Sequence, residues 1–115
     1  MPIDKDLVAA LATPLVLAIL VEGPSYGYAI VKRVRELSDG ELEWSDGMLY
    51  PLLHRLEKSG HVRAEWGASD TGRKRRNYHI TESGRAELAD QRRQWDTANR
   101  TLGGLWGMTV ATGEA

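Results

Sequence analysis

The stretch from Ser45 to Gly60 places the tightest limit on the fold, because it predicts one short helix with both of its ends marked. Ser45 can accept hydrogen bonds from first-turn amides, and Gly60 stands where many helices stop in a left-handed conformation. One apolar stripe has helical spacing and consists of Leu49, Leu52, Leu53 and Leu56. The opposite face is expected to carry Gly47, Tyr50, Pro51, His54 and Lys58. Such a face suits a nucleic-acid groove, but from these residues alone an ordinary solvated surface is the more common case.

Two helices are expected before this stretch. Residues 4–22 predict the first one, and its helical spacing is kept by Leu7, Leu11, Leu15, Ala18 and Ile19. Pro14 either kinks this helix or starts a shorter helix after an N-terminal arm, and we favour one kinked helix. Residues 22–25 then predict a turn, with Ser25 placed to cap a second helix that ends near Leu37.

The second helix is predicted to have distinct inner and outer faces. The inner face is expected to hold Tyr26, Ile30, Val34 and Leu37. The outer face is expected to hold Tyr28, Lys32 and Arg35. Gly27 lies near the inner side, where its missing side chain lets another helix approach closely. After this helix, residues 38–41 predict a loop and residues 42–44 a very short strand.

After Gly60 the spacing of the apolar residues changes from a helical period to a period of two. One segment alternates through Val62, Ala64 and Trp66, and a second through Tyr78 and Ile80. A glycine-bounded turn over 67–72 separates them and is followed by four consecutive cations, Arg73, Lys74, Arg75 and Arg76. Residues 63–76 hold five cations and two carboxylates, whereas the whole chain has a net charge of −1. The pattern predicts a β-hairpin with a cationic tip.

A final helix is predicted to begin after Thr81, whose hydroxyl can cap it, with Glu82 favourably placed in its first turn. Its apolar residues fall mainly on heptad positions and are Leu88, Trp95, Ala98, Leu102 and Leu105. Polar residues at 91–92 interrupt the repeat, so it is no regular zipper. The glycines at 103–104 are expected to end or fray the helix.

Three helices followed by a hairpin with a cationic tip are the element order of a winged helix-turn-helix, whose third helix enters a DNA groove. We therefore predict a mainly α fold with a small β-hairpin, consisting of a winged helix-turn-helix and a C-terminal dimerisation helix. The expected divisions are a DNA-binding domain over 1–80, the dimerisation helix over 81–106 and a disordered tail over 107–115. The cations supply affinity for phosphates, and the exposed helix face supplies contacts to bases.

Composition argues against several other classes of protein. The absence of cysteine excludes disulfides and thiolate metal sites and favours a reducing, cytoplasmic location. The longest apolar run, residues 15–21, is too short to cross a membrane, and the N-terminus lacks signal-peptide features. No carboxylate pair stands beside a base, and no glycine loop suits a phosphate, so we expect neither an enzyme nor a cofactor. No metal site is expected, because His54, His61 and His79 lack ligand spacing, although the last two could be neighbours across the hairpin.

Four segments of the chain resemble the PadR-like family of transcriptional regulators. Residues 23–30 (GPSYGYAI) are similar to the family's GPxxGYxI segment, and residues 45–57 to its S-x-G-T-L-Y-P-x-L-x-R-L-E recognition helix. Residues 66–78 resemble the family's wing, and residues 80–84 (ITESG) resemble the LTxxG entry to its last helix. The single C-terminal helix resembles the family's short subgroup, which implies that this helix forms a homodimer.

Two positions depart from the family pattern. Met48 stands where the family usually has threonine, so a hydroxyl that could reach a phosphate is absent. Asn77 stands where an aromatic residue is common in the wing. Recognition of a DNA sequence should therefore depend more on Tyr50 and His54, although the Tyr50 ring could instead pack against the wing. Both departures argue against transferring a family operator sequence to this chain.

The predicted function is a sequence-specific DNA-binding transcriptional regulator that acts as a dimeric repressor on palindromic double-stranded DNA. The residues expected at DNA are Ser25, Tyr28, Ser45, Gly47, Tyr50, Pro51, His54, Lys58, Arg73, Lys74, Arg75 and Arg76. The residues expected in the dimer interface are Leu7, Leu11, Leu88, Trp95, Leu102 and Leu105.

The resemblance also implies a small aromatic or hydrophobic effector that releases the repressor. Trp95 would stack on this effector between the two last helices, although a plain packing role in the interface is the more common one for a Trp in such a helix. The competing function is a winged-helix module for protein–protein assembly with little affinity for DNA. The nearly neutral net charge keeps that alternative open.

Overall fold

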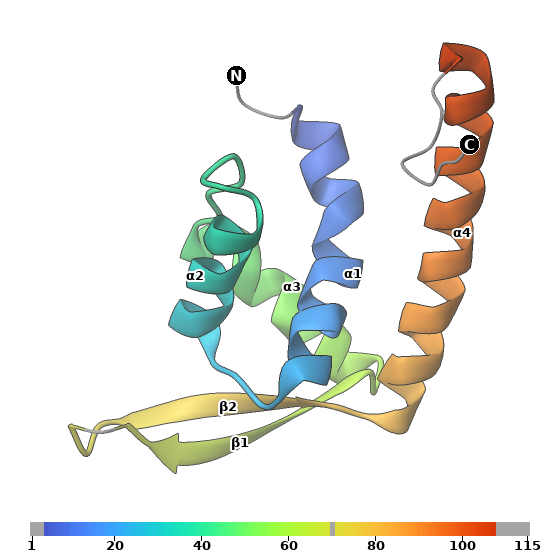
Figure 1. Ribbon diagram of the computed structural model, residues 1–115. Helices are drawn as coiled ribbons and strands as arrows, with labels where there is room; N and C mark the ends of the chain where they lie inside the picture. Colours follow the sequence, from blue (N-terminus) through green and yellow to red (C-terminus); the bar gives the residue numbers. More distant parts are fainter. Residues whose placement is uncertain (1–3, 70, 108–115) are drawn as a thin grey trace.

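The computed structural model describes residues 4–69 and 71–107, which form helices around a small core and a long hairpin (Figure 1). The elements are α1 (Lys5–Glu22), α2 (Gly27–Leu37), α3 (Asp46–Lys58), β1 (Val62–Ala68), β2 (Lys74–Ile80) and α4 (Glu82–Trp106). The hairpin runs beneath the first three helices, and α4 rises on the side of α1 away from α2 (Figure 1). The predicted mainly α winged helix-turn-helix with a C-terminal helix is confirmed. The predicted disordered tail, apart from Gly107, lies outside the described residues.

α1 is one helix that continues through Pro14, as favoured from the sequence. Asp4 caps it, because its carboxylate accepts a hydrogen bond from the Asp6 amide at 2.7 Å. The predicted apolar stripe was only partly right, since Leu7 and Ala18 are exposed. The buried side of α1 consists of Ala12, Val16, Leu17, Ile19 and Leu20. α1 is apolar around much of its circumference, so its sequence pattern alone did not identify the core side.

Ser25 does not cap α2, and that prediction was wrong. Its backbone instead forms an isolated antiparallel bridge with Tyr78, with N–O distances of 3.1 and 2.7 Å. Tyr26 therefore occupies the N-cap position without a side-chain capping bond. Leu37 was predicted to be buried but is 52% exposed, because it is the last residue of the helix and lies beyond the core. Ile30 and Val34 are buried as expected.

α3 has the ends and the buried face that the sequence predicts. The Ser45 hydroxyl accepts from the Met48 amide at 3.3 Å. At the other end, Gly60 has a φ of +83°, and two amides turn back to the helix, Gly60 N to Glu57 O and His61 N to Leu56 O. This bond pattern is a Schellman motif. The four leucines of the predicted stripe, Leu49, Leu52, Leu53 and Leu56, are all buried.

The segment 42–44 was predicted to be a short strand, but it forms no strand in the structure. Its side chains nevertheless belong to the core, because Leu42 and Trp44 are buried against the helices. Met48 also packs partly against this core, so it lies to the side of the exposed face of α3.

β1 and β2 form an antiparallel hairpin with Val62 opposite Ile80 and Trp66 opposite Arg76. The base of the hairpin belongs to the core, where Val62 and Tyr78 are buried. Trp66 follows the same face of β1 but is 65% exposed, because the hairpin extends past the helices. His61 and His79 are not partners across the hairpin, since His79 pairs with Arg63.

α4 is anchored at its first turn. The Thr81 hydroxyl accepts from the Gly84 amide at 3.0 Å and donates to the Gly60 carbonyl at 2.6 Å. Gly84 is packed so closely that an added Cβ would collide with the His61 carbonyl oxygen. The helix then continues through Gly103 and Gly104 to Trp106, so the expected fraying at the two glycines was wrong. Most of α4 past this joint is exposed.

Candidate nucleic-acid interface

The outer face of α3 lies open to solvent. Its members are Gly47, Tyr50, Pro51, His54 and Lys58, all of them exposed. They occupy the side of the helix opposite the four buried leucines, as the helical spacing predicts. The dipole and free amides of the α3 N-terminus, which follows Ser45, add a partial positive charge at one end of this face.

Tyr50 leans from this face toward the start of α2. A Cβ at Gly27 would collide with the Tyr50 hydroxyl and lie 2.9 Å from ring atom Cζ, so the ring depends on the missing side chain. The predicted close approach at Gly27 is thereby confirmed, and the approaching group is the tyrosine ring. The ring is still 42% exposed and thus remains available to a ligand on α3.

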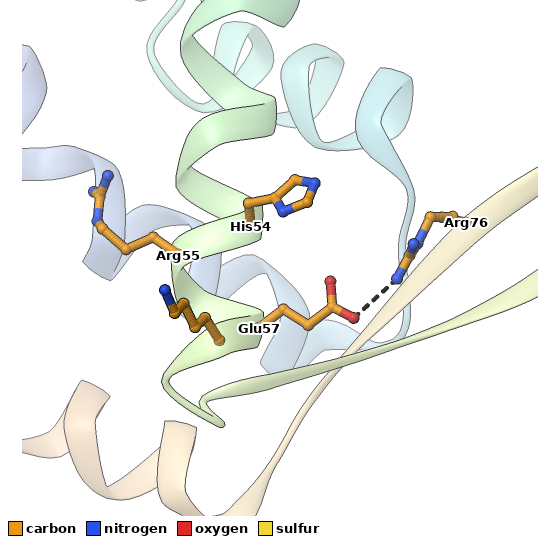
Figure 2. Close-up of a pocket in the computed structure, with 5 residues that line it drawn as sticks. His54, Arg55, Glu57 and Arg76 are labelled. Atoms are coloured by element: carbon orange, nitrogen blue, oxygen red, sulfur yellow. Dashed lines mark hydrogen bonds and ion pairs between the residues drawn. The ribbon is translucent and has the colours of Figure 1, made fainter.

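The four consecutive cations of the hairpin fall into two pairs with different surroundings. The Arg75 guanidinium stacks over the Tyr26 ring at 3.6 Å from its centroid. The Arg76 guanidinium pairs with the Glu57 carboxylate of α3 at 2.9 Å (Figure 2). Arg73 and Lys74 are exposed, and neither forms an ion pair with any residue that the structure describes. The first pair ties the hairpin to the helices, and the second pair is open to phosphates.

A basic hollow of about 640 Å³ lies between the second half of α3 and β2 (Figure 2). It is lined by His54, Arg55, Glu57, Lys58 and Arg76. Figure 2 shows the Glu57 side chain reaching toward Arg76, while Arg55 points away from the hairpin. Since Glu57 is already paired with Arg76, the remaining cations give this hollow a positive character.

A second hollow, of about 510 Å³, combines aromatic rings with cations at the junction of α2, α3 and the hairpin. Its lining consists of Tyr26, Gly27, Tyr28, Tyr50, His54, Trp66, Lys74, Arg75, Arg76 and Tyr78. Six of the twelve residues predicted at DNA line it, namely Tyr28, Tyr50, His54, Lys74, Arg75 and Arg76. The prediction did not include Trp66, although its place at the outer end of the alternating strand could have suggested it.

Tyr78 lines the second hollow and is buried. Burial raises the pKa of its phenol above the ordinary value of 10.0, while the neighbouring Arg76 guanidinium offsets part of that rise. Tyr78 is therefore a neutral phenol wherever proteins normally function. It contributes packing and no charge to the surface above it.

The residues predicted for the dimer interface differ in how far they are exposed to solvent in the single chain. Leu11, Leu88 and Trp95 are half-buried, whereas Leu7, Leu102 and Leu105 are exposed, Leu105 to 81%. Trp106 was not predicted in this set but is also 65% exposed. The far half of α4 thus presents large apolar side chains that the described part of the chain does not cover.

The model of the transcriptional regulator PadR-like family matches residues 16–90, which contain α2, α3, the hairpin and parts of the flanking helices. The chain belongs to the PadR-like family of transcriptional regulators. A transcriptional regulator from Mycobacterium tuberculosis is 45% identical over 71 residues, covering 61% of this chain and 65% of that protein.

Solved structures of transcriptional regulators have the same fold. A transcriptional regulator from Clostridium thermocellum superposes with a TM-score of 0.79 at 28% identity, covering 87% of this chain and 97% of the other. A PadR-like transcriptional regulator from Bacillus cereus gives a TM-score of 0.76 at 26% identity, with 96% and 100% of the chains covered. These relatives are regulators of transcription.

Two further observations concern the described residues of this PadR-like regulator. None of its helices is long and apolar enough to pass through a membrane. No three histidine or carboxylate side chains gather in a way that could hold a metal ion within residues 4–69 and 71–107. His61 instead contacts the Ser83 hydroxyl at 2.9 Å, and His79 lies 2.8 Å from a Glu65 carboxylate oxygen.

Proposed function

We propose that this PadR-like regulator is a sequence-specific DNA-binding repressor that acts as a homodimer. The ion pair between Arg76 and Glu57 carries the proposal, because it fixes the cationic strand beside the exposed face of α3. A duplex lying on α3 would then meet bases and phosphates in one rigid arrangement. Repression by occlusion is the simplest mode for such a compact protein.

Each predicted DNA contact has a role in this proposal. Tyr50 and His54 meet base edges or phosphates from the middle of α3, and Pro51 and Gly47 bring the backbone close to the DNA. Lys58 extends this contact surface at the end of the helix. Phosphates are bound at three places. The first is the N-terminus of α3 near Ser45, and the second is the start of α2, with Ser25 and Tyr28. The third is the hairpin, which contributes Arg73, Lys74, Arg75 and Arg76.

A salt-dependence experiment tests the phosphate contacts. The double variant Arg73→Ala/Lys74→Ala is expected to weaken binding to every duplex and to lower the slope of log K against log salt by about two, roughly 0.9 per contact. The matched control is Arg85→Ala/Arg92→Ala, which removes the same charge from exposed positions on α4. If both variants change the slope equally, the hairpin is not the phosphate-binding element.

Selection from a random-sequence duplex library tests the palindromic operator. A dimer is expected to enrich an inverted repeat whose half-sites are about one helical turn apart, ~34–36 Å. Tyr50→Phe and His54→Ala should change the enriched sequence within the half-sites. An unenriched pool, together with release from heparin at low salt, would favour the competing protein–protein module.

The apolar residues of α4, with Leu7 and Leu11 of α1, support the proposed dimer. Large exposed apolar groups concentrated on one helix are typical of a surface that another protein covers. Leu102→Glu/Leu105→Glu should give a monomer in analytical ultracentrifugation, whereas the unaltered chain should sediment as a dimer at micromolar concentration. A monomeric unaltered chain would contradict the proposal.

A small aromatic or hydrophobic effector between two α4 helices completes the proposal. Trp95 lies midway along α4 and is half-buried in the single chain, so a partner helix would enclose it in an apolar site. Candidate aromatic compounds should quench tryptophan fluorescence and release DNA. Trp95→Ala should abolish both effects and keep the dimer. Loss of the dimer instead would show that Trp95 is a packing residue of the interface.

A further inference from the structure

Trp66 is a large apolar ring that lies mostly in solvent. It shares the inner face of β1 with the buried Val62 and the half-buried Ala64, yet its own side chain is 65% exposed. A ring of this size gains much free energy from burial, so leaving it in solvent forgoes a large contribution to stability. Its cation–π contact within the fold is with the Arg76 guanidinium, and that contact leaves most of the ring open to solvent.

Trp66 is linked to α3 through Arg76. Arg76 lies opposite it in the hairpin, with the guanidinium 5.5 Å from the ring centroid. The same guanidinium is held by Glu57 of α3 at 2.9 Å. Arg76 thus links the recognition helix to the strand that carries the ring. The guanidinium over the indole is therefore the same one that is paired with α3.

Trp66 also opens onto the surface where DNA is proposed to lie. It lines the aromatic and basic hollow together with Tyr50 and His54 of α3 and with Lys74 of β2. An aromatic ring beside cations is the arrangement on which nucleic-acid bases stack, because every base has a π-face and every nucleotide a phosphate. Apolar side chains at DNA surfaces also open base steps by partly inserting between them.

We propose that Trp66 stacks on one base step of the bound duplex and partly unstacks it. This inference rests on the proposed DNA-binding function and adds a specificity-determining residue to it. The step beneath the ring is selected by how easily it opens, and no hydrogen bond to a base edge is needed. Flexible pyrimidine–purine steps are therefore preferred there, and stiff A-tracts are disfavoured.

The first test uses the enriched operator with 2-aminopurine placed at each step in turn. We expect the protein to raise 2-aminopurine fluorescence at one step in each half-site, on the base that is separated from its neighbour and does not itself lie on the indole. Trp66→Leu should remove this signal and weaken binding by roughly tenfold. Trp66→Phe should retain part of both effects, which excludes a simple folding defect.

The second test separates stacking from general affinity. Replacing the responsive step by an A-tract step should weaken binding of the unaltered protein but should leave the affinity of Trp66→Leu unchanged. The salt slope of Trp66→Leu should equal that of the unaltered chain, because no phosphate contact is removed. Retained operator binding with no 2-aminopurine signal would overturn the proposed role of Trp66 and would leave the DNA-binding proposal intact. Failure to enrich any operator would overturn the DNA-binding proposal itself.

Discussion

α3 and α4 begin and end with similar local signals but differ in what covers them. A hydroxyl caps each first turn, Ser45 in α3 and Thr81 in α4, and a glycine of positive φ follows each end. α3 nevertheless buries four leucines within its own chain. α4 leaves Leu105 and Trp106 mostly exposed. Local signals therefore set where a helix lies along the chain, and they do not determine whether the chain itself completes its packing.

The largest expected effect contrasts a leucine of α3 with a leucine of α4. Leu53→Ala should lower the free energy of unfolding by about 2–5 kcal/mol, because it leaves a cavity in a fully buried site. Leu105→Ala should change it by less than about 0.5 kcal/mol in dilute protein, where the side chain is exposed. Urea unfolding followed by circular dichroism measures both values.

Protein concentration sharpens this contrast. If α4 pairs with a second copy, Leu105→Ala should become more destabilising as the concentration rises, whereas the effect of Leu53→Ala should stay constant. Equal costs for the two variants at low concentration would show that α4 is already packed within one chain.

The next effect concerns the joint at which α4 leaves the domain. Gly84→Ala should cost about 1–3 kcal/mol, because the added Cβ meets the His61 carbonyl and lies 2.8 Å from Ile80 Cγ1. Gly104→Ala, in the same helix with open space around it, should stabilise by up to about 1 kcal/mol. Thermal unfolding of both variants is the measurement. If Gly84→Ala leaves the stability unchanged, the backbone at this joint can shift to accept the added Cβ at no cost in free energy.

Removing the two caps tests how alike the helix starts are. Ser45→Ala should cost about 1 kcal/mol, the usual value for a lost N-cap. Thr81→Ala should cost more, about 2 kcal/mol, because its hydroxyl also donates to the Gly60 carbonyl and so joins α4 to the end of α3. Equal losses in denaturant unfolding would show that this second bond contributes nothing.

The smallest expected effect concerns Tyr78 of β2, which is buried in the same core as the leucines of α3, and it depends on pH. The pKa of Tyr78 is raised in the folded protein, so the unfolded chain loses this proton first as the pH increases. The stabilisation from the neutral phenol is therefore complete below about pH 10 and declines above it. Tyr78→Phe removes the titrating group and should make the alkaline decline shallower in urea unfolding series. Parallel declines in both proteins would contradict the raised pKa.

The hairpin shows where prediction from the sequence stopped. The change of period after Gly60 predicts both strands, and the structure confirms them. The sequence presents 73–76 as one run of four cations, whereas the structure places Arg75 on Tyr26 and Arg76 on Glu57. Tyr26 and Glu57 are about 20 to 50 positions away, so no local pattern could indicate these partners.

The predicted cap at Ser25 and the predicted strand over residues 42–44 were wrong for a related reason. Serine before a helical run is a common cap, but the backbone of Ser25 is used by Tyr78 of β2. Residues 42–44 alternate like a strand, yet among the described residues no strand pairs with them, and the alternation instead places Leu42 and Trp44 in the core. Local preference was overridden in both places by a tertiary contact.

The sequence by itself determined the order of the elements, the ends of α3 and the buried leucine stripe, because hydrogen bonds and spacing within a few residues control these features. It also carried the segments that resemble the PadR-like family, to which the chain belongs. Only the tertiary structure decided which side of α1 is buried, which cations are tied to the helices, and that Trp66 extends past the core into the hollow beside α3. These features depend on contacts between distant parts of the chain, whose geometry no local pattern contains.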